Sequence, residues 1–338
     1  MLQLRWKTAL ATALCTAASF QPGLAQAPPP AILTVDVQNR VRYYQDTSDV
    51  SKFATSQVIT TATASNNFIQ AVSIGDIVAI NGQPAKGTMT TITRTITLRP
   101  APNAGEATAD ATRSDLADYA FEILGMDGKP IGTIVGFGPG GGSAPPGAPL
   151  SVTQGNNAIV GGTGAFLGAR GYLGQAVNAD TVTIRSASIT EDPSNRRRFP
   201  GGRNFYVLQV IPMVRPEIMA SASGPAVAHS SDFSLVTASK PAAAGEILSA
   251  FITGLGPTRP GVDPGKPFPA SPLAVVNSPV GVMVNGTPAE VLAAVGFPGA
   301  VDGYQVNFRV PADAAKGAAT VQVTAAWIAG SSVNIPIQ

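Results

Sequence analysis

One glycine-rich stretch of the chain has the residue types and spacing of a ligand-binding loop. It reads AIVGGTGAFLGARGYLG from 158 to 174 and follows a short apolar run. Gly162, Gly164 and Gly168 imitate the fingerprint of a dinucleotide-binding loop, in which glycines let the backbone approach a pyrophosphate. The chemistry of such a loop would be phosphate binding at the N-terminus of a helix.

The spacing and the flanking sequence argue against a nucleotide site. The glycines read G-x-G-x-x-x-G, one residue longer than the fingerprint. The segment that would have to form the helix contains Gly168, Gly171 and Gly174, and each glycine costs a helix about 1 kcal/mol. An alternating run, ADTVTIRSASI, comes next instead. We therefore predict a strand, a tight glycine turn and a second strand, as in a closely curved barrel.

The first 25 residues are predicted to be a secretory signal peptide. Arg5 and Lys7 precede an apolar run, and the small residues of GLAQA end it. Cleavage fits after Ala25 or after Ala27, and we favour Ala25 because Pro28 would follow the other cut. The expected location is therefore secreted or periplasmic, with no integral membrane segment after cleavage.

Removal of this leader excludes several classes of chemistry. Cys15 is the only cysteine, so its loss excludes disulfides, thiol nucleophiles and thiolate metal sites. His229 is the only histidine, which argues against a Ser-His-Asp triad and against His-rich metal sites. Lys plus Arg fall from 22 to 20 and match the 20 Asp plus Glu. We expect no metal, no cofactor and no nucleic-acid partner.

Short alternating runs, separated by many of the 36 glycines and 29 prolines, predict an all-β chain. About eight runs precede residue 212, enough to close a small barrel or to form a sandwich over 26–211. The segment 212–225 interrupts the pattern and is expected to be a linker. Strands resume over 226–338, where Asn285-Gly286 has the chemistry of a hairpin turn. An immunoglobulin-like antiparallel sandwich is expected there.

Three loops stand out between the strands. The segments 99–115 and 138–149 are low-complexity insertions. A third loop, 191–204, carries four arginines: Arg196, Arg197, Arg198 and Arg203. Such a loop either binds an anionic ligand or surface, or is a solvated hairpin tip.

The glycine-rich stretch resembles the signature of the dirigent and allene-oxide-cyclase barrel family, which is close to G-G-T-G-x-F-x-x-A-R-G-Y. The residues that fit are Gly161, Gly162, Thr163, Gly164, Phe166, Ala169, Arg170, Gly171 and Tyr172. The runs SIGDIVAINGQ, TRTITL and GTIVGF fall where that barrel has strands, so the resemblance covers 31–211. It implies an eight-stranded antiparallel barrel with an apolar cavity, often a homotrimer. Plant members steer reactions of lipophilic small molecules without a cofactor.

The resemblance implies two catalytic positions. Arg170 lies in the motif, and Asp46, in VRYYQD, resembles the early-strand aromatic-x-His-Asp of dirigent proteins, with Gln45 replacing the histidine. The aspartic acid would protonate or orient an intermediate, and the guanidinium would fix a phenolate or carboxylate. The same two residues are equally compatible with a structural ion pair or with separate surface groups.

Three further residues are candidate ligand contacts in this barrel. Asp76 offers an alternative partner for Arg170. Tyr119 shares one face of its strand with two apolar residues. Arg94 lies on a face with Ile92 and would line the interior, unless the alternate face, which carries Thr91, points inward.

Residues 216–338 resemble a C-terminal β-sandwich module found on many uncharacterised secreted proteins of soil bacteria. The elements TGLGPT and G-Y-Q-V-N-x-x-V-P carry this resemblance. It implies an accessory unit without assigned catalytic residues. Tyr304, Gln305 and Asn307 are expected to anchor strands, and His229 to lie on the surface or to cap a strand.

Three functions compete at this point. A dirigent-like barrel would hold Asp46 and Arg170 together inside an open cavity. A lipocalin-type binding module would have an open cavity lined only by apolar groups. A structural or adhesive surface protein would have an interior filled by side chains. The fold alone does not decide among them.

Overall fold

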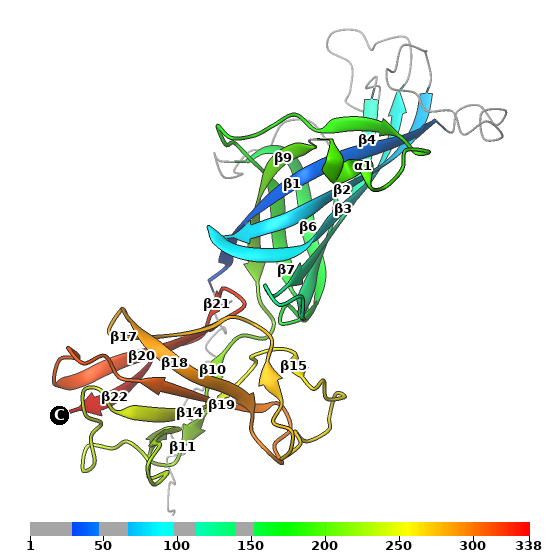
Figure 1. The fold of residues 1–338 in the computed structure, drawn as a ribbon. Helices are drawn as coiled ribbons and strands as arrows, with labels where there is room; N and C mark the ends of the chain where they lie inside the picture. The colour runs from blue at the N-terminus through cyan, green and yellow to red at the C-terminus, as the bar shows by residue number, and fades with distance from the viewer. Residues whose placement is uncertain (1–28, 47–66, 98–112, 139–151, 200) are drawn as a thin grey trace, which may run out of the picture.

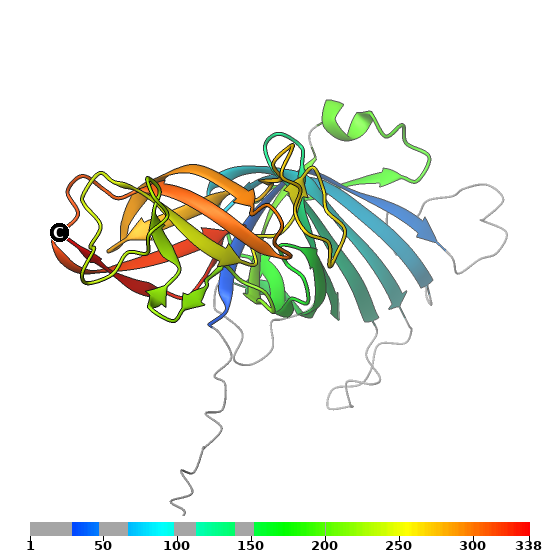
Figure 2. The same ribbon diagram turned by 90° about the horizontal axis from the view of Figure 1, so that it is seen from below.

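The computed structural model describes residues 29–46, 67–97, 113–138, 152–199 and 201–338. Within these ranges the chain is all-β and forms a closed antiparallel barrel followed by a second, curled sheet (Figures 1 and 2). The predicted leader and most of the two low-complexity insertions lie outside the described residues. No helix in the described part of the chain is long and apolar enough to cross a membrane.

Eight strands close the barrel, as predicted, in the order β1–β2–β3–β4–β5–β6–β7–β9, with β2 also paired to β1. They are β1 (Ala31–Asp46), β2 (Asn67–Ile80), β3 (Gln83–Thr97), β4 (Arg113–Leu124), β5 (Pro130–Gly138), β6 (Val152–Gly164), β7 (Arg170–Ala176) and β9 (Gly202–Ile211). All pairings around the barrel are antiparallel. Because successive side chains alternate between the two faces of a strand, every second residue faces the interior.

Apolar side chains fill the half of the barrel nearest the second unit. Leu33, Val35 and Val37 of β1 face inward and are fully buried. Their neighbours in one cluster include Met89, Phe121, Ile123, Ile134, Ile159, Phe166, Leu173, Leu208 and Val210. On β3 the threonine face points inward, since Thr91 is buried and Arg94 is exposed.

The glycine-rich motif forms the β6–β7 hairpin, which confirms the predicted strand–turn–strand. Phe166 inserts into the barrel core from the turn and is only 1 % exposed. A Cβ on Gly162 would lie 2.2 Å from the Phe166 carbonyl oxygen, so the chain can fold back there only without a side chain. Gly164 and Gly168 have φ of +60° and +69°, which favours glycine at both ends of the turn. The glycines therefore serve backbone geometry.

An arm between β7 and β9 lies against the outside of the barrel. It contains β8 (Arg185–Ser188), which pairs parallel to β1, and the short helix α1 (Asn195–Arg198). Figure 1 shows this arm beside β1 at the end of the barrel away from the second unit. Most of the four-arginine loop belongs to the arm, but its last residues, with Arg203, begin β9.

The second unit is one curled sheet, with its path running β10–β14–β19–β18–β17–β20–β21. Its strands are β10 (Glu217–Ile218), β13 (Val227–His229), β14 (Ile247–Thr253), β15 (Thr258–Arg259), β16 (Val275–Val276), β17 (Val280–Val284), β18 (Thr287–Gly296), β19 (Gly303–Arg309), β20 (Gly317–Ala325), β21 (Ile328–Ala329) and β22 (Val333–Ile337). A separate pair, β11 (Ala220–Ser221) and β12 (Gly224–Pro225), flanks them. Because β10 pairs with β14, the sheet begins inside the segment expected to be a linker.

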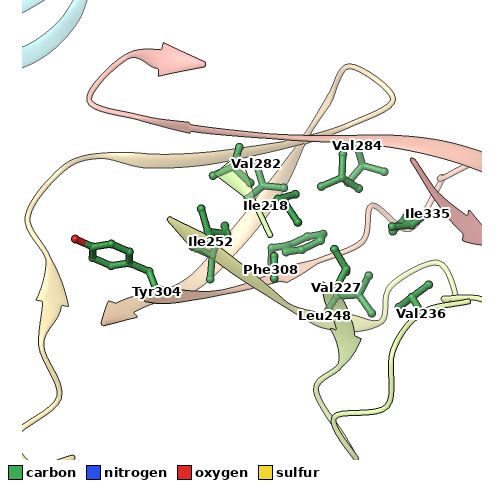
Figure 3. Close-up of a cluster of buried hydrophobic side chains, with 14 of the residues drawn as sticks. Ile218, Val227, Val236, Leu248, Ile252, Val282, Val284, Tyr304, Phe308 and Ile335 are labelled. Atoms are coloured by element: carbon green, nitrogen blue, oxygen red, sulfur yellow. The ribbon is translucent and has the colours of Figure 1, made fainter. Parts of the chain in front are cut away.

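The curl of this sheet encloses its own apolar core. Phe308 of β19 is fully buried and lies among Leu248, Ile252, Val282 and Val284 (Figure 3). The β17–β18 turn is the predicted Asn285-Gly286 hairpin, and both residues have positive φ, 49° and 80°. Such φ values match the twist of the flanking strands.

The tip of the β20–β21 hairpin closes one end of the barrel. Ala326 and Ile328 belong to the buried cluster of the barrel, at 0 % and 2 % exposure, and Trp327 packs against that cluster. The Trp327 indole N–H donates to Gln83 Oε1 at 3.0 Å. The two units therefore share one continuous apolar core at this contact.

The motif glycines provide a direct test of the barrel geometry. A Cβ on Gly171, whose φ is +140°, would lie 1.9 Å from the Gln209 carbonyl oxygen on β9. We expect Gly171→Ala to lower the free energy of unfolding by about 2–4 kcal/mol, because the β7–β9 pairing must shift. Chemical denaturation measures this loss. The matched control is Gly161→Ala, where no atom lies within 4 Å of the added Cβ. Equal stability of the two variants would contradict this close packing of β7 on β9.

Candidate functional site

Polar side chains line the barrel interior beyond its apolar half. Arg42, Ser73, Thr91 and Tyr119 stand opposite one another on β1 to β4, so they form one inward row across four strands. Ser73 and Thr91 are 1 % and 2 % exposed, and Arg42 Nε lies 3.5 Å from Ser73 Oγ. A row of inward polar groups does not fit a barrel packed only for stability.

Arg40 and Tyr206 form the centre of this polar region. The Arg40 guanidinium lies over the Tyr206 ring, 5.6 Å from its centroid. Arg40 Nη1 donates to Asn204 Oδ1 at 3.1 Å. The Tyr206 ring also makes edge contacts with Phe121 and Tyr119, at centroid distances of 5.4 and 6.4 Å. All these side chains face the barrel interior.

A β-bulge turns Arg40 inward. Leu33, Val35 and Val37 face the interior, so strict alternation would place Arg40 outside. Asn39 has a φ of +51°, and around it the register of β1 shifts against both neighbouring strands, between Val37 and Arg40 against β9 and between Gln38 and Val41 against β2. The bulge reverses the alternation, because one extra residue moves the following side chains to the other face.

Three polar atoms in this region are buried without a hydrogen-bond partner among the described residues: Arg40 Nε, Asn157 Oδ1 and Tyr206 Oη. Arg40 is 5 % exposed, and its contacts in the described chain are an amide oxygen and an aromatic ring, with no carboxylate. Each such buried, unpaired group costs about 1–3 kcal/mol, and a charged group costs more. This is the strongest concentration of unsatisfied polarity in the described chain.

Burial raises the pKa of Tyr206 to about 12, although the positive charge of Arg40 acts in the opposite direction. The hydroxyl therefore carries its proton at neutral pH and can donate a hydrogen bond. Together with Arg40 Nε it offers two donors inside an apolar wall. Two such donors suit an oxygen-bearing, anionic or strongly accepting group.

Asp46 and Arg170 are not brought together. Arg170 pairs with Ile211 at the end of the barrel where β1 begins, whereas Asp46 ends β1. β1 has 16 residues, so at about 3.3 Å per residue the two positions are separated by roughly 50 Å along the strand. Arg170 is exposed and donates to the Ala169 carbonyl oxygen of its own turn at 3.0 Å. The side chain of Asp46 lies outside the described residues.

Asp76 pairs with the arm rather than with Arg170. It faces outward on β2 and accepts hydrogen bonds from Arg196 Nη2 at 2.8 Å, from Arg197 Nε and Nη2 at 3.0 Å each, and from Asn39 Nδ2 at 3.0 Å. Burial opposes ionisation, but the hydrogen bonds from Arg197, Arg196 and Asn39 outweigh it and lower the pKa of Asp76 to about 2. Asp76 therefore fastens the arm to the outside of the barrel.

The remaining candidates divide between the two faces of the barrel. Tyr119 faces the interior beside Tyr206. Arg94 faces outward and forms an exposed ion pair with Asp118 at 2.9 Å, so it does not line the interior. Arg203, near the start of β9, pairs with Asp36 of β1 through two hydrogen bonds, of 2.7 and 3.1 Å. Three of the four arginines of the loop thus bind carboxylates of the barrel itself.

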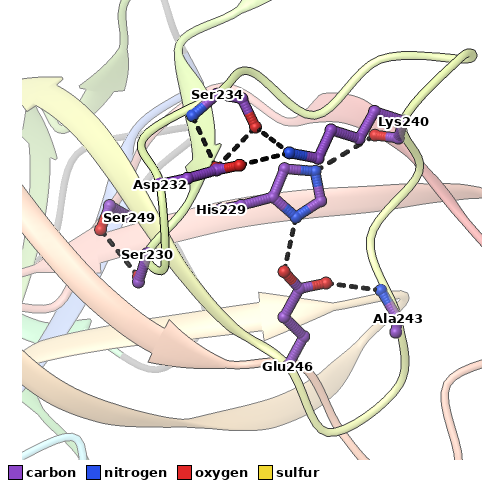
Figure 4. Close-up of polar contacts among 8 residues, drawn as sticks. All are labelled: His229, Ser230, Asp232, Ser234, Lys240, Ala243, Glu246 and Ser249. Atoms are coloured by element: carbon purple, nitrogen blue, oxygen red, sulfur yellow. Dashed lines mark hydrogen bonds and ion pairs between the residues drawn. The ribbon is translucent and has the colours of Figure 1, made fainter.

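The single histidine belongs to a buried polar contact of the second unit. His229 ends β13 and is 4 % exposed, so the expected surface position is wrong. Figure 4 shows its Nδ1 facing a Glu246 carboxylate oxygen, and its Nε2 facing the Lys240 carbonyl oxygen at 3.2 Å. The second Glu246 oxygen accepts the Ala243 N–H at 2.8 Å. These contacts tie a loop to the edge of the sheet and leave neither ring nitrogen available for chemistry.

Of the polar residues that face the interior here, the sequence singled out Tyr119 but not Arg40, Asn157, Asn204 or Tyr206. The one local signal was Asn39-Arg40 inside an alternating strand, since asparagine tolerates positive φ and marks a bulge. The described residues contain no cluster of His, Cys, Asp and Glu that could hold a metal ion. Comparisons with family models, with curated proteins and with solved structures find no match to this chain.

Asp76→Asn tests whether this carboxylate fastens the arm. We expect the variant to lose about 1–2 kcal/mol of unfolding free energy at pH 7, because it gives up charge-assisted hydrogen bonds. The folded pKa of Asp76 is below its ordinary value of 3.8, so its contribution is complete above pH 4 and disappears as the pH falls towards 2. Urea denaturation across this range should show the two proteins converging. Asp118→Asn, in an exposed pair, is the control and should cost no more than about 0.5 kcal/mol. A constant difference from pH 6 to pH 2 would refute the assignment.

Proposed function

We propose that the barrel binds a small lipophilic molecule whose anionic or accepting head group contacts Arg40 Nε and the Tyr206 hydroxyl. The observation that carries this proposal is the buried Arg40 guanidinium, which lacks a carboxylate partner in the described chain. An unpaired buried cation is costly, and a bound anion would offset that cost. The neighbouring apolar cluster offers a surface for the rest of the ligand.

The arrangement of the barrel supports binding from one end. The half beside the second unit is filled by apolar side chains, and the hairpin tip at Ala326–Ile328 closes it. The polar row lies farther along the strands. The unpaired atoms are shielded from solvent, so a ligand reaches them only when covering side chains move. Side-chain rotamer changes on binding are common even where the backbone moves little.

The family and location that we propose follow from the sequence. The motif from Gly161 to Tyr172 supports a dirigent and allene-oxide-cyclase-like barrel, and 216–338 supports an immunoglobulin-like sandwich module. The basic and apolar leader supports export to the periplasm or the exterior. Tyr119 remains a proposed ligand contact. We assign no joint catalytic role to Asp46 and Arg170, because the register of the barrel separates them.

A scaffold or adhesive protein is the competing function. The filled apolar half of the barrel favours it, since a scaffold needs no cavity. The polar row and the unpaired Arg40 favour binding instead, because a scaffold gains nothing from these groups. Native mass spectrometry of the protein recovered from its own host separates the two: retained small-molecule mass supports binding, and a bare chain supports a scaffold.

Arg40→Met tests the proposed head-group contact. We expect naphthalene-2-carboxylate to bind the unaltered protein in a calorimetric titration and to bind the variant at least about tenfold more weakly. The reason is the loss of a charge-assisted hydrogen bond, which is worth about 1.5–3 kcal/mol. Arg198→Met, at an exposed position of the arm, is the matched control and should leave the affinity unchanged. Equal affinity in the two variants would remove Arg40 from the site.

The outer face of the barrel supports the proposed homotrimer. Leu116, Val135, Phe137 and Val160, on β4 to β6, are between 38 % and 46 % exposed. Phe137 stands opposite Asp118 and Val135 opposite Ala120, so these side chains share one outward surface. Exposed apolar patches of this kind mark contacts between proteins. We propose that two further copies of the chain cover it.

Sedimentation velocity tests the trimer. The unaltered protein should sediment as a trimer at micromolar concentration, and Phe137→Glu should shift it to monomer because a buried charge opposes association. Leu273→Glu, at an exposed position of the second unit, should leave the trimer intact. A monomeric unaltered protein would rule the homotrimer out.

A further inference from the structure

A crevice between the barrel and the second unit lies outside the site described above. It has a volume of about 340 Å³. The barrel contributes the start of β3, through residues such as Ala85, the β4–β5 turn, through residues such as Met126, and Ile131 of β5. The second unit contributes Asn277, Ser278 and Trp327. The volume is within the range of small-molecule sites, at their lower end.

Two hydrogen bonds hold the walls of this crevice together. Asn277 Nδ2 donates to the Pro130 carbonyl oxygen at 3.0 Å, and the Trp327 indole N–H donates to Gln83 Oε1 at 3.0 Å. Each bond crosses from one unit to the other. The crevice is therefore a fixed feature of the contact between the units and not a gap between independent surfaces.

Two polar atoms at the crevice are buried without a partner in the described chain. They are Asn277 Oδ1 and Ser278 Oγ, and Ser278 is only 6 % exposed. The Pro130 carbonyl oxygen requires the amide nitrogen of Asn277 to face it, so the remaining amide atom is the oxygen, an acceptor. An unpaired acceptor and an unpaired hydroxyl on consecutive residues of the lining call for a donor group.

The residues that line the crevice also favour a neutral ligand over a charged one. Asp127 is the only charged residue among those that line the crevice, and Lys129 Nζ pairs with it at 2.7 Å. The other walls include the Trp327 ring and the fully buried Ile131. Both unpaired atoms are shielded from water, so a ligand reaches them when a lining side chain moves. Met126, unbranched and 53 % exposed, has the freedom to do so.

We propose that this crevice binds a neutral hydroxy-aromatic molecule, with its ring system against Trp327 and its hydroxyl donating to Asn277 Oδ1 beside Ser278 Oγ. The ligand would contact both units at once. Binding should therefore raise the unfolding temperature as well as change the environment of Trp327. This site is separate from the polar region around Arg40 inside the barrel.

Trp327 is a built-in reporter for the test. The chain has two tryptophans, and Trp6 belongs to the leader of 25 residues predicted above, so Trp327 is the only tryptophan of the mature protein used for the test. We expect 4-cyclohexylphenol to shift its emission saturably, and 4-cyclohexylanisole, which lacks the donor, to bind about five- to fiftyfold more weakly. Equal binding of the two probes, or the absence of saturation, would overturn the proposal.

Ser278→Ala, made in the mature protein, tests the polar wall. Without a probe it should be as stable as the parent or more stable, because the hydroxyl it removes is buried and unpaired. With 4-cyclohexylphenol it should bind at least about fivefold more weakly, since a hydrogen-bonding group is lost. Ser223→Ala, at an exposed serine, is the matched control and should bind like the parent. Unchanged affinity in Ser278→Ala would show that the probe does not occupy this crevice.

Discussion

The packing of one hairpin tip into the mouth of the barrel is the contact on which the rest of the structure depends. Ala326 and Ile328 come from the second unit but belong to the buried core of the first. Burial of a large apolar side chain contributes about 1.5–3 kcal/mol, so this contact joins the two units energetically. It also decides where binding can occur, because it closes one end of the barrel and creates the crevice around Trp327.

The barrel is divided into a half that stabilises and a half that carries polar groups. Its filled half has the close packing of an ordinary core, anchored by residues such as Phe121 and Phe166. The other half holds Arg40 and Tyr206 in fixed positions against that core. Rigid packing on one side permits unsatisfied groups on the other, since the core stabilises an arrangement that is locally unfavourable. Ligand binding is the use that we propose for these groups.

The arm shows how charge is arranged on the outside. Its loop of arginines suggested an anion site or a solvated tip. In the structure, Arg196 and Arg197 meet Asp76, and Arg203 meets Asp36. These carboxylates lie more than a hundred residues away along the chain, so no local pattern could pair them. The contacts with Asp76 fasten the arm to β2, and the contact with Asp36 joins the start of β9 to β1, which makes this loop a structural element.

The sequence alone determined what depends on neighbours along the chain. Alternation predicted strands, and glycine spacing predicted the β6–β7 hairpin. Asn285-Gly286 predicted the turn between β17 and β18. The sequence shows these features because they reflect local backbone preferences. Only the tertiary structure decided which side chains meet. A bulge at Asn39 reversed the alternation and turned Arg40 inward, and the length of β1 separated Asp46 from Arg170. Register and closure arise from pairings between distant segments, which a local pattern does not encode.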